Sequence, residues 1–171
     1  MSSDSGTTTT AVSTTRKKGT AMHTLRPIVA IGLMVFAGVA AAADGLVAVK
    51  SPYSAKDTMT RLEEVVKQRG LNVFARIDHA AGASRIGKSL RPTELLIFGN
   101  PQGGTPFMEC EQTVGIDLPL KALVWEDAAA QVWVGYNDPA FLAQRHGTPA
   151  CQAVDNLRKA LAALVQAALN P

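Results

Sequence analysis

The stretch LPLKALVWEDAAAQVWVGY, residues 118–136, carries the clearest indication of the fold. Lys121–Glu126 and Gln131–Tyr136 are short runs rich in apolar and aromatic residues, which is typical of strands. The four residues between them, Asp127–Ala130, fit a hairpin loop. Because strands joined by so short a loop run in opposite directions, this stretch predicts an antiparallel sheet.

The residues before this hairpin predict a helix and several strands. The helix begins after Ser54, whose side chain can cap it together with Asp57, and it ends at Gly70. Residues 80–90 fit either a loop or an irregular helix. The expected strands are Leu46–Lys50, Leu71–Asp78, Thr93–Gly99 and, before the interruption at Pro119, Val114–Leu118.

Three further helices are expected. Thr105 can cap a short helix over Thr105–Gln112, because Pro106 suits the first helical position. A second helix runs from Asn137 or Asp138 to His146, where the imidazole is expected to be structural. The last helix is expected to start at Thr148–Pro149.

This order of elements predicts an α+β fold with a largely antiparallel sheet and its helices on one face. Both faces of the strands carry apolar residues. We expect one set to face the helices: Ala75, Ile77, Leu95, Ile97, Val132 and Val134. We expect the other set to face away: Phe74, Leu96, Phe98, Leu123, Trp125 and Trp133. A homodimer is the expected cover of that second face, and a ligand groove or the 80–90 segment are the alternatives.

The N-terminal part predicts export. Residues 22–43 have a short basic start, an apolar run of about a dozen residues and small residues ending at Ala43, as in a secretory signal peptide. Residues 1–21 are expected to be disordered or a misassigned start, and 44–171 to form a single α+β domain. The expected location is periplasmic or secreted, without a stable membrane anchor after cleavage. The alternative is an uncleaved anchor.

Charge and cysteine content narrow the function classes. Residues 1–43 hold four of the 17 basic and one of the 14 acidic residues, so residues 44–171 carry 13 of each. A neutral domain has no basic surface for nucleic acid, which we therefore exclude as a partner. Cys110 and Cys151 are expected to form a disulfide in an exported chain. Two separate buried thiols or a two-cysteine metal site are the alternatives.

Four motifs resemble the domain of unknown function 302 family. They are FARIDHAAGA (74–83), ELLIFGNPQGGTPFM (94–108), GIDLPLKALVWED (115–127) and VWVGYNDPAFLAQRHG (132–147). The resemblance implies a small α+β domain similar to the TATA-binding-protein-like β-α-β4-α arrangement, a tendency to dimerise, and no agreed activity. The two cysteines are not part of the family pattern.

Three groups of residues are candidates for a site. Asp78 and His79 could position a metal ligand or a base, and with Asn100 they are the catalytic candidates. The turn-rich stretch 99–106 offers backbone N–H groups beside a helix start, as a generic anion site does. Lys121 could pair with Asp78 or Glu94. The ligand-binding candidates are Gly99, Asn100, Gly103, Gly104, Thr105, Lys121 and Trp125.

No zinc, haem or nucleotide motif occurs, so neither a metal nor a cofactor is expected. The leading hypothesis is an exported module that binds a small ligand or a partner. The alternatives are a hydrolase or metal-assisted enzyme centred on Asp78 and His79, and a purely structural dimer.

Overall fold

The computed structural model describes residues 7–9, 11 and 45–170. The chain divides into two units, 1–36 and 37–171, and in the first of them the described residues form neither helix nor strand. The predicted signal peptide (22–43) lies outside the described residues, as does most of 1–21. Among the residues that are described, no helix is long and apolar enough to cross a membrane.

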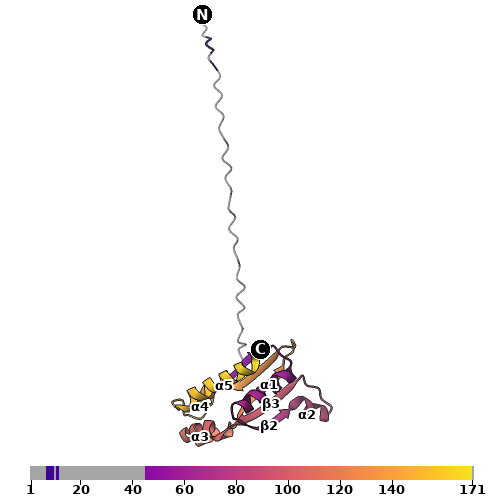
Figure 1. Ribbon diagram of the computed structural model, residues 1–171, viewed down its shortest axis with the longest axis vertical. Coiled ribbons are helices and arrows are strands. Elements are labelled where there is room, and N and C mark those ends of the chain that lie inside the picture. The colour runs from indigo at the N-terminus through magenta and orange to yellow at the C-terminus, as the bar shows by residue number, and fades with distance from the viewer. Residues whose placement is uncertain (1–6, 10, 12–44, 171) are drawn as a thin grey trace, which may run out of the picture. The chain divides into compact units, whose positions relative to one another are not determined.

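Residues 45–170 form one α+β domain (Figure 1). Its elements are β1 (Leu46–Lys50), α1 (Ala55–Gln68), β2 (Asn72–Asp78), α2 (His79–Arg85), β3 (Thr93–Gly99), α3 (Pro101–Cys110), the 3-10 helix η1 (Gln112–Ile116), β4 (Leu120–Glu126), β5 (Val132–Asn137), α4 (Pro139–Arg145) and α5 (Ala153–Leu169).

The five strands form one sheet in the order β1-β5-β4-β3-β2. Every neighbouring pair is antiparallel, including β4 and β5, whose hairpin pairs Trp125 with Trp133. The predicted α+β class and its β-α-β4-α order are confirmed, with α2, α3, η1 and α4 as additions between the core elements.

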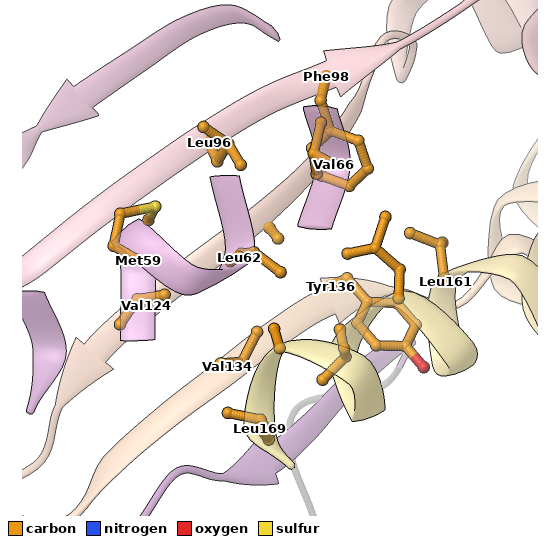
Figure 2. Close-up of a cluster of buried hydrophobic side chains, with 14 of the residues drawn as sticks. Met59, Leu62, Val66, Leu96, Phe98, Val124, Val134, Tyr136, Leu161 and Leu169 are labelled. Carbon is orange, nitrogen blue, oxygen red and sulfur yellow. The ribbon is translucent and has the colours of Figure 1, made fainter. Parts of the chain in front are cut away.

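Helices α1 and α5 cover one face of the sheet and form the main core with it. Ser54 caps α1 as predicted, because its hydroxyl oxygen accepts a hydrogen bond from the Asp57 amide at 3.1 Å. Figure 2 shows Met59, Leu62 and Val66 of α1 gathered with side chains from β3, β4, β5 and α5. Each buried side chain of this size contributes about 1.5–3 kcal/mol to folding.

The predicted division of the two sheet faces is wrong for β2 and β3. Leu96 and Phe98 are fully buried under the helices, whereas Leu95 and Ile97 lie on the opposite face. The run Leu95–Phe98 is apolar throughout, so it carries no alternation that could fix its phase. In β2 the register shifts between Val73 and Ala75, and this bulge places Ala75 and Ile77 opposite Ile97 and Leu95. The assignments of Val132, Val134, Leu123, Trp125 and Trp133 agree with the strand pairing.

Three predicted boundaries also differ from the structure. Val114–Leu118 is not a strand: Gln112–Ile116 is a 3-10 helix, with Val114 buried in a second apolar cluster. Helix α3 begins at Pro101 and not after Thr105, because Asn100 provides the cap and Pro106 lies inside the helix. Helix α5 begins at Ala153, since Thr148–Cys151 forms a turn closed by the Cys151 amide and the Thr148 carbonyl at 3.1 Å.

Candidate functional site

A disulfide fixes one end of helix α3, which forms one wall of the candidate site. Cys110 and Cys151 are bonded, with their Cα atoms 5.9 Å apart, which confirms the predicted bridge. Cys110 is the last residue of α3, and Cys151 precedes α5 in the second apolar cluster with Phe107 and Leu157. The bond therefore holds the C-terminal end of α3 beside the start of α5.

Between α3 and α5 lies a cavity of about 520 Å³, here called the α3–α5 pocket. Its walls are formed by the end of β3, helix α3, the segment from Gly115 in η1 to Leu120 at the start of β4, and α5. The α5 wall consists of Leu157, Ala160, Leu161 and Leu164. Nearly all lining side chains are apolar, so the pocket suits an apolar ligand.

Two glycines let the backbone of α3 form part of the wall. The Asn100 carboxamide oxygen accepts a hydrogen bond from the Gly103 amide at 2.8 Å, which caps the helix. A Cβ atom on Gly103 would lie 3.3 Å from that oxygen and 3.8 Å from a Leu157 methyl group. A Cβ on Gly104 would lie 3.4 Å from Leu118. A methyl group at Gly103 would therefore crowd the capping oxygen, whereas at Gly104 it would meet Leu118 at ordinary van der Waals distance.

The start of β2 and the residue after α1 contribute exposed side chains to the rim of the pocket, here called its mouth. The bulge in β2 turns Phe74 outward, and its side chain is 57% exposed while still lining the pocket. Arg69 lines the same opening, and its guanidinium donates a hydrogen bond to the Ala163 carbonyl at 3.1 Å. The mouth thus combines an aromatic ring with one positive charge.

The structure brings together five of the seven predicted ligand-binding residues. These five line the pocket: Gly99, Asn100, Gly103, Gly104 and Thr105. Two of the backbone N–H groups expected to bind an anion are already used, because the amides of Gly103 and Gly104 donate hydrogen bonds to Asn100. Lys121 and Trp125 lie outside the pocket. The Lys121 ammonium donates to the carbonyls of Asp117 (2.7 Å) and Pro119 (3.0 Å), so its expected pairing with Asp78 or Glu94 is wrong.

The catalytic candidates do not converge. Asp78 caps α2 by accepting a hydrogen bond from the Ala81 amide at 2.8 Å, and His79 is an exposed first residue of that helix. Asp78 lies opposite Glu94 at the start of β3, whereas Asn100 follows the end of β3, about 20 Å further along the strand. Figure 1 shows α2 and α3 correspondingly well apart. In residues 45–170 no cluster of three or more His, Cys, Asp or Glu could hold a metal ion.

A hydrogen-bonded cluster around His146 joins α4 to η1. The imidazole Nε2 lies 2.7 Å from an Asp117 carboxylate oxygen, and Nδ1 lies 2.9 Å from the Thr113 hydroxyl. Glu111 accepts hydrogen bonds from the Thr113 amide and hydroxyl, which lower the pKa of its carboxyl group. The His146 side chain is only 8% exposed. These contacts agree with the structural role expected for His146. They also hold η1 and the residues after it, which supply Gly115 and Leu118 to the pocket wall.

The sheet face opposite α1 and α5 carries a stacked tryptophan pair. The rings of Trp125 and Trp133 are 6.3 Å apart between centroids, and the Trp133 indole N–H donates to Asp127 at 2.8 Å. This bond and the amides of Gln131 and Ala129 lower the pKa of the Asp127 carboxyl group. Leu95, Ile97 and Leu123 on this face are half-buried.

Comparison with known proteins now identifies the family. The model of the Domain of unknown function DUF302 matches residues 47–164. The chain belongs to this family. An uncharacterised conserved DUF302 protein from Bacillus stearothermophilus has a crystal structure similar to this fold, with a TM-score of 0.67 and 25% identity over 74% of this chain and 99% of that one. The predicted family and fold are therefore confirmed.

Two curated relatives carry a similar sequence within longer chains. The chain is 54% identical over 102 residues to proteins named fluoride-specific ion channel FluC 1 from Brucella suis and from Brucella abortus. The match covers 60% of this chain but only 40% and 38% of those relatives. This chain thus spans about two fifths of their length, and the printed names describe those whole proteins.

Proposed function

We propose that this DUF302 domain binds a small apolar molecule in the α3–α5 pocket. The volume of about 520 Å³ falls within the range of small-molecule sites, and most of the side chains that line it are apolar. The occurrence of a similar sequence within longer relatives supports a binding module rather than a self-contained enzyme. The separation of Asp78 from Asn100 gives an enzyme centred on them no support.

The second apolar cluster and the disulfide fix the segments on either side of the pocket. Phe107 and Leu157 anchor α3 and α5 in the second apolar cluster, and the disulfide joins the same two helices. A wall built in this way needs little rearrangement when a ligand enters, and pre-organisation favours affinity.

A plug variant tests the proposal. Ala160 is exposed on α5 and lines the pocket, so Ala160→Phe fills the space without displacing a core side chain. Ala162→Phe is the matched control, since Ala162 is also exposed but lies about 200° around the helix. We expect the full chain to bind the neutral dye N-phenyl-1-naphthylamine, and Ala160→Phe to weaken binding at least tenfold while Ala162→Phe does not. Equal binding by all three proteins would contradict the proposal.

We also propose that the protein works outside the cytoplasm. The signal-peptide pattern over 22–43 and the Cys110–Cys151 bond both support export, because disulfides persist in oxidising compartments. N-terminal sequencing of exported protein should give Asp44 as the first residue. Recovery of an intact, membrane-bound chain would contradict cleavage.

A homodimer through the tryptophan-bearing sheet face is a second proposal. The 80–90 segment offers little shielding, because its large apolar side chains, Ile86 and Leu90, are 73% and 54% exposed themselves. Ile77 lies on this face at 40% exposure, so Ile77→Glu should convert a dimer to a monomer in analytical ultracentrifugation. Ile116→Glu is the control, because Ile116 is 75% exposed in η1, outside the sheet. A wild-type protein that sediments as a monomer at micromolar concentration would contradict the dimer.

A further inference from the structure

One charged side chain, that of Arg69, lies at the α3–α5 pocket. Arg69 follows the last turn of α1, and its Nη2 donates to the Ala163 carbonyl in α5 at 3.1 Å. This bond ties the guanidinium to the helix that supplies Ala160 and Leu164 to the pocket wall. An arginine carries five N–H donors, so this bond leaves further donors of an exposed group for a ligand.

No acidic side chain balances Arg69 at the pocket. The other lining residues are all uncharged. None of the ion pairs between described residues includes Arg69, because they use Lys67, Arg76, Arg145, His146 and Arg158. The pocket therefore joins an apolar interior to one positive charge at its mouth.

Building on the proposed binding function, we propose that the ligand is a small amphipathic anion. Its apolar body lies against Leu118, Leu157 and Leu161, where a second charged or strongly polar group would be left unpaired. Its head is a carboxylate or a phosphate, the two groups whose geometry a guanidinium matches. Fatty acids and alkyl phosphates share this chemistry.

Calorimetric titration of the full chain separates the two parts of the ligand. The probes are octanoate, decanoate, decyl phosphate and the neutral 1-decanol. Each buried methylene should tighten binding about fourfold, so decanoate should bind about fifteenfold more tightly than octanoate. Whichever of decanoate and decyl phosphate binds more tightly identifies the head group.

The Arg69→Gln variant tests the role of the charge. We expect it to weaken decanoate binding about fivefold and to leave 1-decanol binding unchanged, because the charged head alone uses the guanidinium. Arg69→Lys should recover part of the loss. Lys56→Gln is the matched control, since Lys56 is an exposed cation about 20 Å away at the other end of α1. High salt should weaken decanoate binding and not 1-decanol binding.

The outcomes distinguish this inference from the function on which it rests. If 1-decanol binds but decanoate binds no better and is insensitive to Arg69→Gln, the anion is wrong and the apolar pocket stands. An equal loss of both ligands in Arg69→Gln assigns the arginine a structural role and also overturns the inference. If none of the four probes binds, both proposals fail.

Discussion

Reduction of the Cys110–Cys151 disulfide should destabilise the domain by about 4 kcal/mol. The two cysteines are 41 residues apart, and closing a loop of that length removes about 13 cal/mol/K of chain entropy from the unfolded state. With a urea slope near 2 kcal/mol/M, the unfolding midpoint should fall by about 2 M. The bond also joins the end of α3 to the turn before α5, so its loss should loosen the two helices that flank the pocket.

The assay is urea unfolding of the wild type with and without a reductant, followed by tryptophan fluorescence. The double variant Cys110→Ala/Cys151→Ala is the control, because a reductant should not change its midpoint. Dye binding at the pocket should weaken together with stability. A midpoint shift below about 0.5 M, with complete reduction verified, would refute the reasoning and show that packing alone holds α3 against α5.

Three further changes test local features. Gly135→Ala should destabilise the domain by about 1–3 kcal/mol in urea unfolding, because the new Cβ would lie 2.7 Å from the Trp125 ring; a loss below 0.5 kcal/mol would contradict this close contact. Asp127→Asn should remove a stabilisation that depends on pH. Because the pKa of Asp127 is lowered in the folded state, its ionised carboxylate stabilises the fold above about pH 3.9, and this stabilisation is lost as the pH falls through the folded pKa. The melting temperatures of variant and wild type should therefore converge at low pH, and a constant difference between them would contradict this argument. His146→Gln should cost about 1–3 kcal/mol because it disrupts the bonds to a nearly buried imidazole, while the exposed Arg145→Gln should cost less than about 1 kcal/mol; equal costs would be inconsistent with the cluster.

The sequence predicted the elements that depend on residue composition and capping within a few positions of the chain. The hairpin from Lys121 to Tyr136 and the helix capped by Ser54 are confirmed, because strand composition and a capping side chain act within a few residues. The start of α3 was predicted wrongly because the chain contains two candidate caps followed by proline, Asn100–Pro101 and Thr105–Pro106. The structure uses the first, with the Asn100 carboxamide oxygen accepting a hydrogen bond from the Gly103 amide, and the local sequence does not distinguish the two.

Which residues of β2 and β3 face the helices could not be predicted for a similar reason. An unbroken apolar run such as Leu95–Phe98 fits either face, and the bulge after Val73 reverses the alternation of β2. The pocket was predicted in part. The glycine-rich end of β3 is a local signal for a site, whereas Arg69, Leu118 and Ala160 meet it only through folding of distant segments.

The most direct test of the binding proposal is a ¹H–¹⁵N NMR titration of the full chain with 1-decanol. The expected result is a saturable shift of the backbone amides that surround the pocket, those of Gly99, Gly103, Gly104, Leu157 and Ala160. The indole N–H signal of Trp133, on the opposite sheet face, should stay unchanged. Shifts confined to the tryptophan face, or no saturable shift at any amide, would contradict a ligand site between α3 and α5.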